Sequence, residues 1–223
     1  MVADQGSRSR FEDARRRMVD TQIRRRGIVD QRVLQAMEHV ARHIFVPDES
    51  IPDAYADSPL GIGEGQTISQ PYIVGLMTEM LRLDPTHTVL EVGTGCGYQT
   101  AILAEMVKTV FTVDIRAILH DSARTRLESL GYSNIRFRLG DGHEGWSECA
   151  PFDRVVVTAA ARQVPPRLIE QMRFGGLMVI PVGNAVEGQV LRLVTKSSGL
   201  AIDIKDIVPV RFVPMTSNIE EAQ

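Results

Sequence analysis

The chain has 223 residues, of which 43% are hydrophobic and 24% are charged, so it can enclose one large core, and we expect residues 1–223 to form a single domain. Its formal net charge of -3 at pH 7 argues against a nucleic-acid-binding protein, because such proteins normally carry a surplus of basic residues on one face. Two cysteines, Cys96 and Cys149, are too few for a disulfide framework or a zinc site, so we expect a cytoplasmic protein that holds no metal. No segment approaches the ~20 apolar residues that span a bilayer, so we also expect no contact with a membrane.

The N-terminal part of the chain, up to residue 70, predicts helices followed by a long irregular segment. Apolar residues recur at helical spacing over residues 11–39, where Gly27 marks a break and Asp30 is placed to cap the second helix. The arginine-rich runs in this stretch alternate with acidic residues, which is typical of a solvated helix face. Residues 45–71 lose the periodicity and are rich in proline and glycine. Irregular segments of that length usually carry function.

From Pro71, which opens a helix, the chain alternates between helical and strand patterns. The predicted strands are at 88–92, 110–113, 135–139, 154–158, 177–181, 189–195 and 204–210, and the predicted helices between them are at 98–106, 117–130 and 166–172. Such alternation predicts a parallel sheet with helices on both faces. Only a short loop separates the strands at 177–181 and 189–195, so that pair should be antiparallel. We therefore predict the α/β class: a doubly wound, mostly parallel Rossmann-like sheet with an antiparallel C-terminal part and N-terminal helices.

The most informative segment is the glycine-rich turn at residues 91–98, which reads Glu-Val-Gly-Thr-Gly-Cys-Gly-Tyr and follows a predicted strand. Its three glycines let the backbone turn tightly and allow a ligand to contact the main chain. A dinucleotide-binding turn, G-x-G-x-x-G, would need a glycine where Tyr98 stands, and the carboxylate of Glu91 would repel a pyrophosphate. The turn therefore favours a nucleotide-like cofactor that carries positive charge, with Glu91 in reach of that charge.

Acidic residues also end the next two predicted strands. Asp114 lies about 20 residues after the first glycine, the spacing expected of a carboxylate that binds ribose hydroxyls. Asp141 and Gly142 end the following strand and offer a carboxylate and a backbone N–H to an adenine ring. The carboxyl ends of parallel strands share one edge of the sheet, where open α/β sheets bind ligands. The alternative is that these acids only cap the helices that follow them.

Two hydroxyl side chains, Thr67 and Ser69, stand at alternate positions just before the helix that Pro71 opens. In an extended backbone, alternate residues project to the same side, and a helix N-terminus attracts carboxylates. The segment therefore predicts an anion site. The alternative is that Ser69 only caps the helix.

The sequence closely resembles the protein-L-isoaspartate O-methyltransferase family over residues 18–216. The motifs that carry the resemblance are Gln-Thr-Ile-Ser at 66–69, the glycine turn at 91–98, Gly-Asp-Gly at 140–142, Ile-Pro-Val-Gly at 180–183 and Arg-Phe-Val-Pro at 211–214. The first and last of these are specific to that family, whereas the glycine turn is shared by methyltransferases generally. The resemblance implies that the chain transfers a methyl group from S-adenosyl-L-methionine to the free carboxylate of L-isoaspartyl residues in damaged proteins and peptides. The products would be S-adenosyl-L-homocysteine and an ester that starts repair through a succinimide.

The resemblance also implies roles for single residues. Ser69 would be catalytic, and Thr67 and Ser69 would hold the isoaspartyl carboxylate. The cofactor-binding residues that it implies are Ile68, Glu91, Gly93, Thr94, Gly95, Gly97, Asp114, Ile115, Asp141, Gly142 and Thr216. We also expect no metal, a monomer, N-terminal helices and a substrate loop in residues 1–70, and a cofactor-binding core in residues 71–223.

The chain departs from the family's usual pattern in three places. Cys96 stands where serine is commoner, Gly61 where proline is usual, and Asp114 with Ile115 where bacterial members more often have glutamate and arginine. Aspartate is shorter than glutamate, so we expect Asp114 to change the affinity for ribose. None of the departures removes a side-chain group that the reaction needs.

Three other functions fit parts of the pattern. A methyltransferase of the same fold that acts on nucleic acid or a small molecule is disfavoured by the negative charge and by the absence of an Asn-Pro-Pro-Tyr motif. A nicotinamide oxidoreductase is disfavoured by Tyr98 and by the lack of a Tyr-x-x-x-Lys pair. A non-enzymatic adaptor that binds the cofactor and damaged proteins would have the same binding residues, so only turnover distinguishes it from an enzyme.

Overall fold

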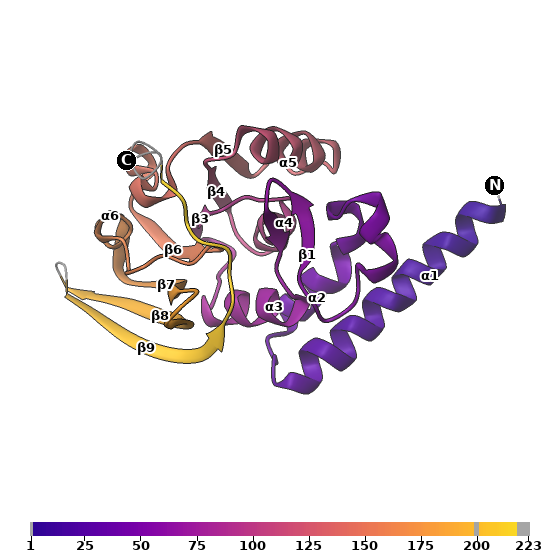
Figure 1. The fold of residues 1–223 in the computed structure, drawn as a ribbon, viewed down its shortest axis with the longest axis horizontal. Helices are drawn as coiled ribbons and strands as arrows, with labels where there is room; N and C mark the ends of the chain where they lie inside the picture. Colours follow the sequence, from indigo (N-terminus) through magenta and orange to yellow (C-terminus); the bar gives the residue numbers. More distant parts are fainter. Residues whose placement is uncertain (1, 199–200, 218–223) are drawn as a thin grey trace.

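The computed structural model of the chain describes residues 2–198 and 201–217, and its centre is one seven-stranded sheet (Figure 1). In spatial order the strands are β5 (Ile135–Leu139), β4 (Thr109–Asp114), β3 (Thr88–Val92), β6 (Phe152–Val157), β7 (Met172–Asn184), β8 (Gly188–Ser198) and β9 (Ala201–Val210). The pairings from β5 to β7 are parallel, and those of β7 with β8 and of β8 with β9 are antiparallel. The predicted fold class and the antiparallel C-terminal part are confirmed.

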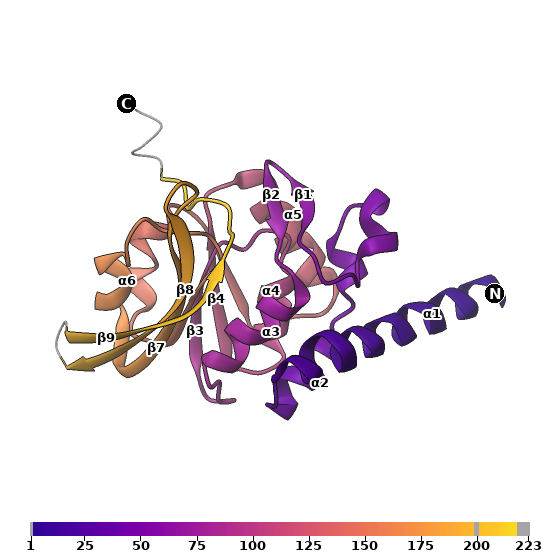
Figure 2. The same cartoon turned by 60° about the horizontal axis from the view of Figure 1, so that its bottom comes forward.

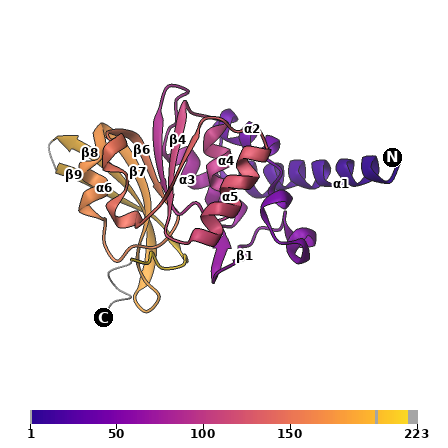
Figure 3. The same cartoon turned by 90° about the horizontal axis from the view of Figure 1, so that it is seen from above.

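Helices cover both faces of this sheet (Figure 3). In the described part of the chain the α-helices are α1 (Val2–Met18), α2 (Gln31–His39), α3 (Pro71–Met80), α4 (Tyr98–Ala104), α5 (Ala117–Ser129) and α6 (Pro166–Glu170). Neighbouring residues of β3 face opposite ways: Val89 joins a core with α2, α3 and α4, while Leu90 joins a second core with α6. Over the described residues, no helix combines the length and the apolar character needed to cross a membrane.

The N-terminal helix is longer than the periodicity predicts, and its outer end extends away from the sheet (Figures 1 and 2). It continues through a π-helical segment, Val19–Ile23, and a 3-10 segment, Arg24–Arg26. The break falls at Gly27, whose φ of 97° is one that glycine adopts without strain. Asp30 caps α2 by accepting a backbone hydrogen bond at 2.9 Å. The predicted break and cap are both confirmed.

The prediction of an irregular segment over residues 45–71 is wrong in part, because the segment contains a 3-10 turn and a short hairpin. The turn is Asp48–Asp53, and the hairpin consists of β1 (Leu60–Gly63) and β2 (Gln66–Ile68). Strands of three and four residues are too short to show an alternating pattern in the sequence. The hairpin places Thr67 on an ordered strand and Ser69 directly after it.

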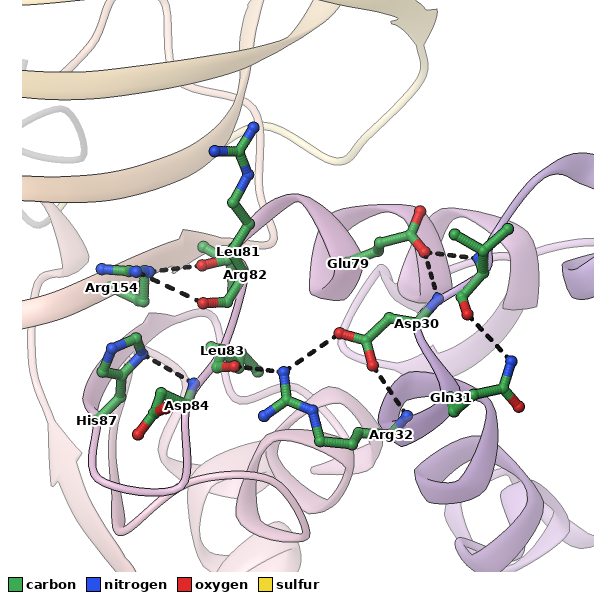
Figure 4. A network of polar contacts seen from close by, with 11 residues as sticks. Asp30, Gln31, Arg32, Glu79, Leu81, Arg82, Leu83, Asp84, His87 and Arg154 are labelled. Carbon is green, nitrogen blue, oxygen red and sulfur yellow. Dashed lines mark hydrogen bonds and ion pairs between the residues drawn. The ribbon is translucent and has the colours of Figure 1, made fainter.

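Polar contacts fix the end of α3 that lies away from this hairpin (Figure 4). Arg154 of β6 donates from its Nε to the carbonyl oxygen of Leu81, and Arg32 of α2 donates to a carbonyl oxygen just beyond the helix at 2.6 Å. Glu79 accepts hydrogen bonds from the backbone N–H groups of residues 29 and 30, at 2.7 and 2.8 Å. The helix that follows Ser69 is therefore tied both to the sheet and to the start of α2.

β7 and β8 extend beyond the predicted strands at 177–181 and 189–195. The additional residues of β7 include exposed positions such as Arg173 and Phe174, so the continuous apolar run that the prediction used covers only the buried part of the strand. The long antiparallel ribbon of β7, β8 and β9 forms one edge of the sheet (Figure 2).

Candidate functional site

One pocket lies at the carboxyl ends of β3, β4 and β6, between the β1–β2 hairpin and the segment that follows β9. Its walls bring together ten of the predicted site residues, which are Thr67, Ile68, Ser69, Gly93, Thr94, Gly95, Asp114, Ile115, Gly142 and Thr216. The other three predicted site residues, Glu91, Gly97 and Asp141, stand behind the pocket wall. The edge of the sheet that the sequence predicts as the binding edge therefore carries a pocket.

The glycine turn forms the floor of this pocket, and steric contacts explain two of its glycines. A Cβ on Gly93 would lie 2.3 Å from the Oγ1 of Thr158, which donates a hydrogen bond to the Gly93 carbonyl oxygen at 2.7 Å. A Cβ on Gly97 would lie 2.9 Å from Leu127 of α5. Both glycines also have positive φ, 96° and 89°. Gly93 thus lets Thr158 pack against the turn, whereas Gly97 lets α5 pack against it from behind.

Asp114 ends β4 and joins the glycine turn to the next strand. Its Oδ2 accepts the N–H of Gly95 at 2.8 Å, and its Oδ1 accepts the N–H of Arg116 at 2.9 Å. The carboxylate is buried, but it still lines the pocket. Each carboxylate oxygen has two lone pairs, so capping its own loop and binding a ligand hydroxyl are compatible roles.

Glu91 does not reach the pocket, and the expectation that it stands in direct reach of a cofactor charge is not met. It points from β3 into the core, where its Oε2 accepts hydrogen bonds from the hydroxyls of Thr100 and Thr112 at 2.6 and 2.7 Å. Complete burial raises the pKa of its carboxyl to about 8, although the two hydroxyls act in the opposite direction. Thr112 lies 2.7 Å from the hydroxyl of Thr94, which lines the pocket. Glu91 therefore supports the wall through Thr112 and Thr94, and its burial favours the neutral form of the carboxyl.

Asp141 is also engaged away from the pocket. Its Oδ1 accepts the backbone N–H of His143 at 2.8 Å, and its Oδ2 accepts the hydroxyl of Ser217 at 2.6 Å. Burial acts to raise the pKa of the carboxyl, but these hydrogen bonds outweigh it and the pKa is lowered. Gly142 does line the pocket, and a Cβ there would lie 2.3 Å from Val92. The capping alternative thus holds for Asp141, which ties the segment after β9 to the end of β5.

Thr67 and Ser69 stand where the pocket meets a second groove, because both residues line both hollows. The N-cap of α3 is Gln70, and neither its side chain nor that of Ser69 accepts a hydrogen bond from the first turn of the helix, so the capping alternative for Ser69 finds no support. A carboxylate already lies at this helix N-terminus, since Asp57 accepts the N–H of Tyr72 at 3.4 Å and pairs with Arg26 at 2.7 Å. The anion site predicted here therefore depends on the two hydroxyls more than on the helix.

Several residues of the pocket were not predicted from the sequence. Thr158 follows the fourth parallel strand, so the rule that found Asp114 and Gly142 would have found it too. Arg116 and Gln66 meet at the hairpin, where the side-chain oxygen of Gln66 lies 3.2 Å from the Arg116 Nε when the amide is oriented to satisfy both groups. Apolar wall residues such as Met77 and Leu119 follow ordinary core spacing, so no sequence signal marks them. No cluster of His, Cys, Asp or Glu side chains that could hold a metal ion is found among the described residues.

Comparison with known proteins agrees with this site. The family model described as protein-L-isoaspartate(D-aspartate) O-methyltransferase (PCMT) matches residues 13–220. The chain belongs to this family. Among relatives in the family, the protein-L-isoaspartate O-methyltransferase 2 of Polaromonas sp. (strain JS666) is 53% identical over 188 residues, 84% of this chain and 89% of the relative. That of Shewanella sediminis is 51% identical over 213 residues, 96% of this chain and 87% of the relative. The resemblance inferred from the sequence is confirmed.

Solved structures of the family share the fold. A protein-L-isoaspartate O-methyltransferase structure superposes with a TM-score of 0.83 at 26% identity, covering 91% of this chain and 66% of that chain. A Plasmodium falciparum structure described as an enzyme of this family, in complex with S-adenosyl-L-homocysteine, superposes with a TM-score of 0.80 at 24% identity, covering 92% and 99%. At 24% identity, the match to the Plasmodium falciparum structure shows a shared fold.

Replacing Glu91 by glutamine should remove a pH-dependent loss of stability. The folded-state pKa of about 8 lies above the usual 4.5, so the stabilisation that protonation gives is complete below pH 4.5 and is lost as the pH rises through about 8. In urea unfolding, we expect the free energy of unfolding of the unchanged protein to fall as the pH rises from about 5 to about 9. Relative to Glu91→Gln, which has no carboxyl to ionise at this position, the loss should be about 1–4 kcal/mol. Glu128→Gln, at an exposed position of α5, is the control. Parallel profiles for Glu91→Gln and the unchanged protein would show that the carboxyl is already ionised.

Proposed function

We propose that the chain transfers the methyl group of S-adenosyl-L-methionine to the free carboxylate of L-isoaspartyl residues in damaged proteins and peptides. The observation that carries the proposal is the position of Thr67 and Ser69 at the junction of the cofactor-type pocket and the second groove. A carboxylate bound there would lie between a nucleotide-like ligand and an outer channel. Membership of the family and relatives at about half identity support the same reaction.

The residues of the pocket suit S-adenosyl-L-methionine. Gly93 and Gly142 line the pocket at positions where a Cβ would collide with Thr158 and Val92, so both glycines keep the neighbouring wall closely packed. We assign to Asp114 the ribose hydroxyls, to Ile115 a face of the adenine, and to Thr94, Gly95, Ile68 and Thr216 contacts along the rest of the ligand. Glu91, Gly97 and Asp141 contribute by holding these residues in place, as their hydrogen bonds and packing indicate.

The chemistry makes few demands on acid–base groups. The cofactor supplies a methyl group on a sulfonium, which is electrophilic without further activation. An isoaspartyl carboxyl with an ordinary pKa of ~4 is already ionised at pH 7, so no general base is needed. Thr67 and Ser69 donate hydrogen bonds that orient the carboxylate oxygen toward the methyl group, and the hairpin keeps water from both. The methyl ester is more reactive than the carboxylate, so the neighbouring backbone nitrogen attacks its carbonyl carbon, displaces methanol and closes a succinimide without the enzyme. Hydrolysis of the succinimide returns some normal aspartate.

We infer further that the chain works as a single-domain monomer in the cytoplasm, without nucleic acid or membrane. Residues before and after position 70, such as Leu34 and Val89, share one hydrophobic core, which supports one domain with an N-terminal part and a cofactor-binding part. The net charge of -3 supports a substrate other than nucleic acid. Both cysteines are free thiols, which suits a reducing compartment.

The test of the function is methyl transfer to a synthetic isoaspartyl peptide beside its normal aspartyl twin. We expect labelled methyl groups to enter the isoaspartyl peptide and to leave the twin unlabelled, because only the first presents the free carboxylate in the required geometry. An RNA sample in the same assay tests the alternative that the chain methylates nucleic acid. Binding of S-adenosyl-L-homocysteine without any turnover would instead support the adaptor.

Ser69→Ala should lower turnover of the isoaspartyl peptide by about tenfold to a hundredfold, because it removes a hydrogen bond of about 1.5–3 kcal/mol to a charged carboxylate. The affinity for S-adenosyl-L-homocysteine should stay almost unchanged. Steady-state kinetics and calorimetric titration measure the two effects. Ser129→Ala, at the exposed end of α5, is the matched control. Unchanged turnover would remove Ser69 from the reaction.

Asp114→Ala should act mainly on cofactor affinity, whereas Ser69→Ala acts mainly on turnover. The affinity for S-adenosyl-L-homocysteine should fall by about 1–3 kcal/mol, because hydrogen bonds to a charged acceptor are lost and the N–H of Gly95 loses its partner. Calorimetric titration measures this loss, and Asp203→Ala, at an exposed position of β9, is the control. Full affinity in Asp114→Ala would show that ribose binds elsewhere.

A further inference from the structure

The second groove has a single charged residue in its lining. It shares Thr67, Ser69, Thr158 and Val213 with the pocket, and most of its remaining lining side chains are apolar. Arg211 is the exception: among the described residues that line the groove, it alone carries a full charge. If a carboxylate binds at Ser69, as the proposed function requires, the peptide on either side of it runs along this groove and past Arg211.

The backbone that presents Arg211 is held in place. The side-chain amide of Gln189, which is buried, accepts the N–H of Phe212 at 2.6 Å and donates to its carbonyl oxygen at 3.1 Å. The next carbonyl oxygen, of Val213, accepts the N–H of Ala160 at 2.8 Å. These bonds fix the segment directly after β9, so Arg211 has a defined place at the groove rather than on a loose loop.

The guanidinium of Arg211 is exposed, and within residues 2–198 and 201–217 no ion pair compensates its charge. The arginine of the neighbouring strand differs, since Arg192 pairs with Asp206 at 2.7 Å. A guanidinium stays positive at every physiological pH and can bind a carboxylate through two parallel hydrogen bonds. Arg211 therefore offers a ready cationic partner to a ligand that lies in the groove.

We propose that Arg211 makes the groove select isoaspartyl sites that have an acidic side chain nearby in the sequence. This inference rests on the proposed function and adds a substrate class to it. The carboxylate of a flanking aspartate or glutamate binds the Arg211 guanidinium, while the isoaspartyl carboxylate binds at Thr67 and Ser69. A flanking lysine or arginine is repelled by the same charge.

Peptides that differ only in the residues beside the isoaspartyl test this selection. A set with glutamate, glutamine or lysine at each of the two positions before and after the isoaspartyl gives kcat/KM for each neighbour. For the unchanged protein we expect the best acidic peptide to exceed its lysine counterpart by about three- to tenfold at low salt, since one exposed attraction replaces one exposed repulsion, and the ratio to shrink in about 0.5 M salt.

Variants assign the effect to one side chain. Arg211→Glu should reverse the order of the acidic and basic peptides, Arg211→Gln should level it, and Arg211→Lys should keep part of it. Arg136→Glu makes the same change of net charge on β5, at the opposite edge of the sheet from β9, and should leave the order as it was. Calorimetric titration with S-adenosyl-L-homocysteine checks that each variant keeps its fold and cofactor affinity.

The outcomes separate this inference from the function beneath it. Methylation of all isoaspartyl peptides at one rate, or a preference that Arg211→Glu leaves intact, overturns the selection and leaves the proposed function standing. An equal loss for every peptide in Arg211→Gln also overturns it, because Arg211 would then act on the isoaspartyl carboxylate or on the shape of the groove. Methylation of no isoaspartyl peptide overturns both.

Discussion

The hydrogen bond between the Gly95 N–H and the Asp114 carboxylate joins the glycine turn to the neighbouring strand, and much of the site depends on it. The turn holds three positive φ angles, at Gly93, Gly95 and Gly97, and a backbone of that kind has little stability of its own. Asp114 fixes it from the side, and Thr158 fixes it from the next strand through the Gly93 carbonyl oxygen. The floor of the pocket is thus set by contacts between three parallel strands.

A second set of contacts places the reacting side of the site. The hairpin and α3 bring Thr67 and Ser69 over the pocket, and α3 is held at both ends: by Asp57 near its start and by Arg154 and Arg32 near its end (Figure 4). None of these three residues lines the pocket. The position of the two hydroxyls therefore depends on ion pairs and backbone caps that lie outside the site itself.

The order of strands and helices could be predicted from the sequence because the inner parallel strands β3, β4 and β6 are largely buried and read as compact apolar runs, while the edge strand β5 alternates apolar residues with arginines. The glycine turn and Asp114 could be found for a related reason, since spacing along the chain fixes which strand end each occupies. The roles of Glu91 and Asp141 could not. Whether a carboxylate at a strand end points into the pocket or behind it depends on the direction of one side chain, and both point to hydroxyls supplied by distant segments, Thr112 and Ser217. The hairpin escaped prediction because its strands are too short for a pattern.

The segment after β9 affects the order in which the site is assembled while the chain is being made. Thr216 lines the pocket and Ser217 binds Asp141, 76 residues earlier in the sequence. The strand ends that form the floor, at residues 92–95, 114 and 158, are made well before this segment. A nascent chain can therefore form its glycine turn while this side of the pocket still stands open, and the wall is complete only after residues 216 and 217 have been made.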